Sequence, residues 1–192
     1  GNVTVFTGRF FKEVIKPPFE IKEFLKQCYI IGYKSLPLIT LTGFITGMVF
    51  TKQSRPSLME FGATSWLPSL VSIAIVRALA PLITSLISAG KVGSSIGAEL
   101  ASMRVTEQID AMEVSGINPF KYIVVTRVLA ATLMLPVLVV ASDAISLYGA
   151  YVGVNLKGDV SFHLFFLQVF EKLTFSDVVP AIAKTFFFGF FI

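Results

Sequence analysis

Long apolar runs with few charges constrain the fold of this chain more than any other feature of its sequence. A helix that crosses a membrane needs roughly 20 mainly apolar residues, and several runs in this sequence approach or exceed that length. We therefore predict an all-α, polytopic membrane protein, a helical bundle in which residues 1–192 form a single domain. The predicted spans cover residues 35–52, 67–90, 123–156 and 178–192.

The composition agrees with a membrane protein and excludes several other classes. Charged residues make up 15% of the chain, against roughly 25% in soluble globular domains. No basic stripe with interleaved aromatic residues suggests nucleic-acid binding. The single histidine, His163, excludes a multi-histidine metal site, and we expect no metal, cofactor or catalytic residue in this chain. The motif "AGKVGSS" lacks the spacing of a phosphate-binding loop, so ATP should not bind through it.

Basic residues gather before the first apolar run and indicate the orientation of the chain. Six of the 16 lysines and arginines precede residue 35, and positive charge favours the cytoplasmic side of a membrane. The N-terminus is therefore predicted to be cytoplasmic. Within residues 1–34, the stretch "FEIKEFLKQCYIIGYK" has an amphipathic pattern that suits a helix in the cytoplasmic interface. An amphipathic helix packed against protein is an equally good interpretation of this pattern.

The last apolar run continues to the final residue of the sequence. It begins near Val178 and is still apolar at "FFFGFFI". Because a half-span would leave backbone groups without hydrogen bonds in lipid, we expect the sequence to be a piece of a longer protein.

Four charged residues lie in or beside the apolar runs, namely Arg77, Asp143, Asp177 and Lys184. An ionisable side chain at membrane depth costs at least about 2.5–3.5 kcal/mol, so it faces the interior of a bundle or a water-filled cavity. Asp177 and Lys184 are two helical turns apart, so both can face the same space. The four residues are candidates for a substrate cavity. Ion pairs that only hold the helices together are the alternative.

Three pairs of glycines four residues apart also occur in the sequence: Gly43–Gly47, Gly93–Gly97 and Gly149–Gly153. This spacing lets the backbones of two helices approach closely in lipid. A specific seam between two copies of the chain is one interpretation. Ordinary packing between helices is the default.

A polar stretch, residues 94–118, separates the second and third predicted spans, and we call it the polar connection. Its helical period groups acidic side chains on one face and apolar side chains on another. We predict one amphipathic helix that ends at Gly116, on the cytoplasmic side of the membrane. A plain connection needs only a few residues, so we expect this helix to bind a protein partner rather than to serve as a solvated connector. The candidate docking residues are Glu99, Arg104, Val105, Glu107, Ile109, Asp110, Met112 and Glu113.

The run "AELASMRVTEQIDAMEVSGINP", within residues 77–138, resembles the MlaE family of ABC-transporter permeases. A weaker similarity continues to "DVVPAIAKTFFFG" and covers most of the chain from residue 35 onward. The resemblance implies a homodimeric permease subunit in the bacterial inner membrane, with a further span beyond residue 192. It also implies a cytoplasmic ATPase subunit that binds ATP and magnesium, and an MCE-domain protein that carries lipid across the periplasm.

The resemblance further implies roles for particular residues. The polar connection corresponds to the family's coupling helix, and Arg77, Asp177 and Lys184 correspond to polar residues of its cavity. The transported molecule would be lipid, most directly phospholipid that moves between the inner and outer membranes. This transport would affect the lipid asymmetry of the outer membrane. One departure concerns the cavity, because Ala78 stands where the family has a glutamate. Arg77 is therefore expected to pair with Asp143 or Asp177 instead.

Two other functions are compatible with some of these residues. A secondary transporter would move protons through Asp143, Asp177 and Lys184. An intramembrane enzyme acting on lipid would have only His163 as a histidine base. A lipid-transporting permease with no enzymatic activity of its own is the leading prediction.

Overall fold

Helices make up every regular element that the structure describes. The structure is a computed structural model, and it describes residues 2–15, 20–156 and 160–192. Its α-helices are α1 (Asn2–Ile15), α2 (Ile21–Ile31), α3 (Leu36–Glu60), α4 (Leu67–Ala74), α5 (Ala80–Val105), α6 (Gln108–Val114), α7 (Thr126–Asn155), α8 (Phe162–Lys172) and α9 (Phe175–Phe191). Short segments join them: the 3₁₀ turns η1 (Tyr33–Ser35) and η2 (Thr64–Trp66), and the π-helical turns η3 (Ile75–Leu79) and η4 (Phe120–Val125).

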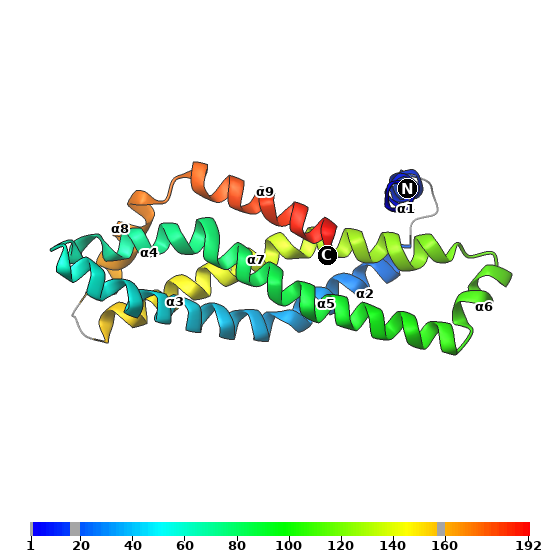
Figure 1. Ribbon diagram of the computed structural model, residues 1–192, viewed down its shortest axis with the longest axis horizontal. Coiled ribbons are helices and arrows are strands. Elements are labelled where there is room, and N and C mark those ends of the chain that lie inside the picture. Colours follow the sequence, from blue (N-terminus) through cyan, green and yellow to red (C-terminus); the bar gives the residue numbers. More distant parts are fainter. Residues whose placement is uncertain (1, 16–19, 157–159) are drawn as a thin grey trace.

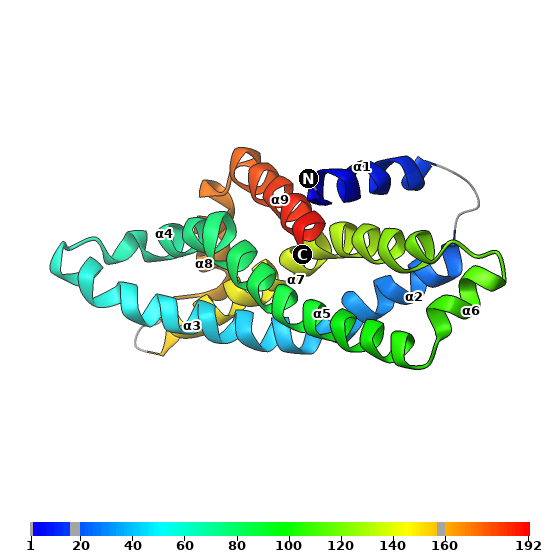
Figure 2. The ribbon, with the colours of Figure 1, turned by 45° about the vertical axis from the view of Figure 1, so that its right-hand side comes forward.

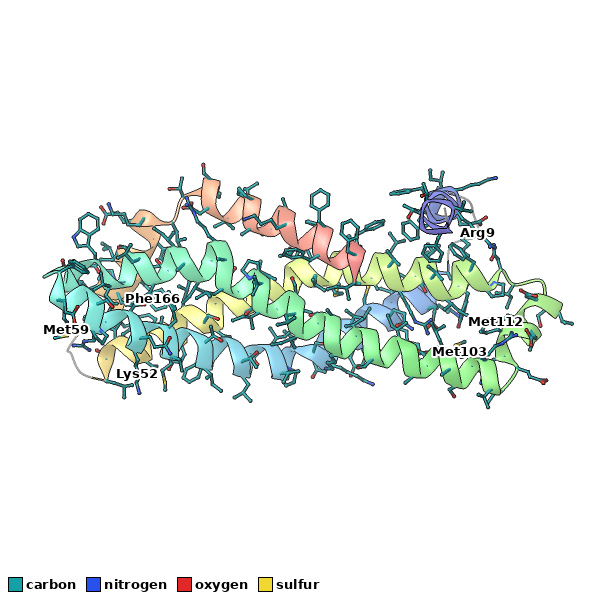
Figure 3. The ribbon with its side chains drawn as sticks, viewed as in Figure 1. Arg9, Lys52, Met59, Met103, Met112 and Phe166 are labelled. Atoms are coloured by element: carbon teal, nitrogen blue, oxygen red, sulfur yellow. The ribbon has the colours of Figure 1, made fainter. Side chains whose placement is uncertain are left out.

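Three long helical rods lie along the long axis of the molecule (Figure 1). They are α3, the rod formed by α4, η3 and α5, and α7. The turn from α3 to α4 lies with α8 at one end, which we call the α8 end, and α6 lies at the opposite end, the α6 end (Figures 1 and 2). In Figure 3, Met59 and Phe166 mark the α8 end, and Met103 and Met112 mark the α6 end.

The rods are long and apolar enough to cross a membrane, as the sequence predicts. The candidate spans are Ile21–Glu60, Thr64–Val105 and Phe120–Asn155. A fourth candidate exists if α8 and α9, which are bent by 79° at a short break, are counted together. The predicted all-α, polytopic membrane fold is therefore confirmed.

The first span is longer at the α8 end than the sequence predicts. Its predicted end is residue 52, but α3 continues to Glu60 with Pro56 inside it. The Arg55 guanidinium donates a hydrogen bond of 3.2 Å to the Val154 carbonyl at the end of α7. This contact supports the last turns of α3, although the proline removes one hydrogen bond of the helix.

A proline explains the change of helix type between α4 and α5. Pro81 has no backbone N–H, and its ring crowds the carbonyl four residues earlier, which belongs to Arg77. The backbone widens there into the π turn η3 and resumes as α5 at Ala80. Single π turns inside helices are frequent at functional sites, and this one carries the first of the charged residues predicted for the cavity.

Glycines let α3 and α7 approach closely. The pairs Gly43–Gly47 and Gly149–Gly153 each lie against the other helix, and a Cβ atom added at Gly47 would overlap the Ser146 carbonyl oxygen. An added Cβ atom at either residue of Gly93–Gly97 would meet nothing within 4 Å. Two of the three predicted pairs therefore serve packing between helices of the same chain.

Helix α2 packs on α7 with its polar side inward. Its buried residues are Glu23, Gln27 and Ile31. Its exposed apolar residues include Ile21, Leu25 and Tyr29. The Gln27 amide and the Tyr122 hydroxyl donate hydrogen bonds of 2.8 and 3.1 Å to the Glu23 carboxylate. Because lipid cannot form hydrogen bonds with polar groups, this orientation suits a membrane. Of the two interpretations of this stretch, the structure supports a helix that packs against protein.

Helix α1 lies across the start of α7 and near the end of α9 (Figure 2). The Phe120 ring meets Phe6 edge to face, and the Arg9 guanidinium lies 4.5 Å from the centre of the same ring. Phe10 is buried and contacts Phe190 of α9. The described part of residues 1–34 is thus attached to the bundle, and residues 16–19 lie outside the described residues.

Candidate functional site

The polar connection folds as two helices, not as the single helix that the sequence predicts. Helix α5 continues from the second span to Val105, and α6 begins at Gln108. Between them, Glu107 has a φ of 56°, in the left-handed region that residues with a Cβ rarely adopt. A single helix over residues 94–118 would be roughly 38 Å long and would carry the chain away from the bundle. The bend instead returns the chain to the start of α7 (Figure 1).

Side-chain and backbone contacts hold both ends of α6. At its start, the Arg104 guanidinium pairs with the Asp110 carboxylate at 3.0 Å across the bend. At its end, the N–H groups of Gly116 and Ile117 bond to carbonyls of the last helical turn at 3.0 and 2.9 Å. Gly116 has a φ of 75°, so these two bonds form a Schellman motif. The predicted end of the helix at Gly116 is confirmed.

The surface of α6 and the bend before it carries acidic and apolar groups together. The exposed acidic residues are Glu107, Asp110 and Glu113. Among the predicted apolar contacts, Val105 is exposed, and Ile109 and Met112 are half-buried. Because both ends of the helix are held, these side chains form one surface at the α6 end.

Glu99 does not belong to this surface, although the sequence groups it with the other acidic residues. Its carboxylate lies 2.7 Å from Nη2 of Arg127, which is on α7. The Arg127 side chain is 6% exposed and the Glu99 side chain 39% exposed. Arg127 also donates a hydrogen bond of 3.3 Å to the Ile123 carbonyl. The ion pair joins α5 to α7 near the point where the polar connection leaves the bundle.

Arg77 and Asp177 come together, whereas the other two candidate cavity residues do not join them. Nε and Nη2 of Arg77 contact Oδ1 of Asp177 in the first turn of α9. The other oxygen, Oδ2, accepts a hydrogen bond of 3.0 Å from the Thr174 N–H, as part of a capping box. The Asp177 side chain is 5% exposed and that of Arg77 is 59% exposed. Of the two partners predicted for Arg77, the structure selects Asp177.

Asp143 and Lys184 lie apart from this pair. Asp143 is in α7, and its Oδ1 is buried without a hydrogen-bond partner in the described part of the chain. Lys184 is exposed on α9 and forms no ion pair with a described residue. The buried stripe of α9 consists of Asp177, Ala181, Thr185 and Gly189. Each step of four residues turns this stripe by roughly 40°, so Lys184, two turns after Asp177, lies outside the buried stripe that begins at Asp177.

The sequence interpretation missed the cluster of Glu23, Gln27 and Tyr122 between α2 and η4. A signal for it existed, because Glu23 and Gln27 are four residues apart and so lie on one side of a helix. We considered this pattern only as an interfacial helix or as a helix packed on protein, and did not predict that its polar residues face inward. In a membrane the polar side of a helix turns toward protein.

The ranges that the structure describes contain no candidate metal site. No three His, Cys, Asp or Glu side chains there are placed to hold a metal ion together. His163 is exposed on α8. The polar groups instead form ion pairs between helices, such as Glu99 of α5 with Arg127 of α7 and Arg77 of η3 with Asp177 of α9.

Comparison with known proteins identifies the family of this chain. The family model described as "Permease MlaE" matches residues 24–192. A protein of Rickettsia felis named "Probable ABC transporter permease protein" is 35% identical over 192 residues, which are 100% of this chain and 74% of the relative. Probable ABC transporter permeases of Synechocystis sp. and Pyropia yezoensis are 33% and 38% identical, over 95% and 86% of this chain and 70% and 63% of the relatives. The chain therefore belongs to the MlaE permease family and is an ABC-transporter permease.

Proposed function

We propose that this permease is the membrane subunit of a system that moves lipid, specifically phospholipid, between the inner and outer membranes of a bacterium. The observation that carries the proposal is the polar connection, which in this MlaE-family chain is a bent, charged segment attached to two spans. Such a segment offers a separate ATPase a surface through which it can move the spans. In this proposal the chain lies in the inner membrane, with its N-terminus and α6 in the cytoplasm, as the basic residues before the first span favour.

The energy of ATP enters at the α6 end. ATP and magnesium act in the ATPase subunit, which contacts the exposed Glu107, Asp110 and Glu113 together with the neighbouring apolar side chains. Surface ion pairs contribute only about 0–1 kcal/mol each, so shape and apolar contact matter as much as charge. Movement of α6 reaches α5 through the bend, and it reaches α7 through the ion pair of Glu99 with Arg127.

Arg77 and Lys184 are suited to bind the headgroup of the lipid. The Arg77 guanidinium stays more than half exposed although it pairs with Asp177, and a guanidinium can bind a phosphate with donors that the pair leaves free. Lys184 is exposed on the same helix as Asp177. A second copy of the chain, in a homodimer, would enclose the space beside Lys184. An MCE-domain carrier would exchange lipid at the α8 end.

Purification of the full-length protein from membranes tests this function directly. Two copies of the permease together with an ATPase subunit, an MCE-domain protein and bound phospholipid would support it. Lipid hydrolysis by the isolated permease would contradict it. So would transport that stops when the proton gradient is dissipated while ATP remains intact.

Reversing two charges at the α6 end is expected to uncouple the ATPase. In the double variant Glu107→Lys with Asp110→Lys, lipid-stimulated ATP hydrolysis should fall about tenfold, which corresponds to about 1.4 kcal/mol, while the permease still dimerises. The matched control is Glu60→Lys with Glu171→Lys, because these two acidic residues are exposed toward the α8 end. Undiminished stimulation in the first double variant, or an equal loss in the control, would contradict docking at α6.

Removing Lys184 is expected to reduce lipid transfer without reducing stability. Lys184 is exposed, so Lys184→Ala should leave the thermal unfolding midpoint unchanged while transfer of a fluorescent phospholipid from reconstituted vesicles falls. Asp177→Ala should reduce transfer as well, and it should also cost about 1–2 kcal/mol of stability because the start of α9 loses its capping carboxylate. Lys172→Ala, an exposed lysine of α8, is the control. Normal transfer by both Lys184→Ala and Asp177→Ala would show that these charges are structural only.

A further inference from the structure

A small pocket with both polar and apolar lining residues lies where α2 joins α3 and both meet α5. Its volume is about 130 Å³, and its polar lining consists of Gln27, Lys34, Ser35, Lys91, Ser95 and Glu99. The ammonium group of Lys91 donates a hydrogen bond to the backbone carbonyl of Lys34, so α5 is tied to the turn η1 at this point. The pocket is separate from the Arg77–Asp177 pair and from the α6 surface.

One polar group in this pocket has no partner. Ser35 is only 1% exposed, and its hydroxyl makes no hydrogen bond to any described residue. Ser35 stands at the N-cap position of α3, yet its side chain does not cap that helix. An unsatisfied buried hydroxyl costs about 1–3 kcal/mol, and a ligand in the pocket that Ser35 lines would supply the missing acceptor after a small movement of the side chain.

The charges around the pocket favour an anion. Lys34 and Lys91 contribute two positive charges. The one carboxylate in the lining, Glu99, is neutralised by Arg127 at 2.7 Å. Glu23, next along α2, is engaged by Gln27, Tyr122 and Lys26. The balance of facing charge is therefore positive.

The depth of the pocket in the membrane also suits a lipid headgroup. Lys34 directly precedes the uncharged run of residues 35–51, and Lys91 directly follows the uncharged run of residues 78–90. Their hydrogen bond shows that both stand at the same level of the bundle. Both lysines lie inside the long helical segments Ile21–Glu60 and Thr64–Val105, and basic residues that border uncharged runs favour the cytoplasmic interface, where lipid phosphates lie.

We propose that this pocket binds a phosphate-class anion, either the phosphate of an anionic lipid headgroup or free phosphate. Lys34 and Lys91 supply charge, and the hydroxyls of Ser35 and Ser95 donate hydrogen bonds. A volume of about 130 Å³ is well above the roughly 10–15 Å³ of cavity that one water molecule needs, and so admits a tetrahedral oxyanion. The bound group fastens η1 to α5 and thereby steadies the junction of the first two spans. The proposal does not depend on which molecule the transporter carries.

Binding to the purified full-length protein tests the site. The probes are phosphatidylglycerol in phosphatidylcholine nanodiscs, phosphatidylcholine nanodiscs alone, and inorganic phosphate, with native mass spectrometry and the thermal unfolding midpoint as readouts. Phosphatidylglycerol that binds and is not displaced by millimolar phosphate identifies a lipid headgroup, and displacement identifies a site for the free anion. Either result supports the proposal provided that Lys34→Gln with Lys91→Gln weakens the binding about tenfold or more, or about 1.4 kcal/mol.

Controls separate the pocket from general surface charge and from misfolding. Lys52→Gln with Lys172→Gln removes two exposed lysines toward the α8 end and should leave binding unchanged within twofold. Ser35→Ala keeps both lysines and should weaken binding about threefold while the apo protein unfolds at an unchanged or higher temperature, because the unpaired hydroxyl is gone. Equal binding by wild type and Ser35→Ala, equal losses in the two lysine double variants, or no binding by any probe would overturn the proposal.

Discussion

Gly47→Ala is expected to destabilise the protein by about 2–3 kcal/mol, whereas Gly93→Ala should leave its stability unchanged or raise it by up to about 1 kcal/mol. At Gly47 the new methyl group would overlap the carbonyl oxygen of Ser146 and approach the backbone nitrogen of Ala150. Backbone atoms cannot rotate aside, so α3 and α7 must move apart. At Gly93 nothing lies within 4 Å of the added atom, and alanine is the better helix former.

Thermal or denaturant unfolding of both variants in the same detergent measures this difference. The two substitutions are chemically identical and both lie inside helices, so helix propensity and side-chain size cancel in the comparison. Equal unfolding midpoints for the two variants would show that the close approach of α3 and α7 does not limit the stability of the bundle.

Glu99→Ala is expected to cost about 2–3 kcal/mol of stability and to uncouple the ATPase from lipid transport. The substitution leaves the guanidinium of Arg127, which is 6% exposed, without its carboxylate. Breaking a fully buried ion pair costs about 3–5 kcal/mol, and the partial exposure of Glu99 lowers the expected value. Glu113→Ala, an exposed residue of the same polar connection, is the control and should change stability by less than about 0.5 kcal/mol.

A double variant separates the structural role of this pair from its role in transmission. Glu99→Ala with Arg127→Leu removes both charges, and replacing a buried pair by apolar groups is often neutral for stability. We therefore expect the unfolding midpoint to recover while lipid-stimulated ATP hydrolysis stays low. Recovery of both quantities would contradict transmission of movement from α5 to α7 through the pair.

Features that depend on a few neighbouring residues could be predicted from the sequence. The length of each apolar run indicates a membrane span, and Gly116 ends α6 because its backbone conformation needs no other part of the chain. The family could also be identified from one run of residues. The match of residues 24–192 to the MlaE permease family confirms that identification. The prediction of a single helix over residues 94–118 was wrong, because the amphipathic pattern of this segment contains no information about where α7 begins.

Features that depend on the arrangement of helices could not be predicted. The sequence suggested Asp143 or Asp177 as the partner of Arg77. In the structure Arg77 contacts Asp177, which lies 100 residues away in the sequence. The sequence grouped Glu99 with the acidic residues of α6, whereas the structure pairs Glu99 with Arg127. The sequence also left open which glycine pairs mediate packing between helices of the same chain.

By itself, then, the sequence determined that this is an all-α membrane protein of a permease family, and where its polar connection lies. Only the tertiary structure decided where that connection bends, which charges pair, and which polar groups of α2 face protein. The physical reason is that a span is specified by the apolar character of one segment, whereas a contact depends on the rotation and register of two helices. A shift of one residue turns a side chain by roughly 100° around its helix, and only packing against the other helices selects among the alternatives.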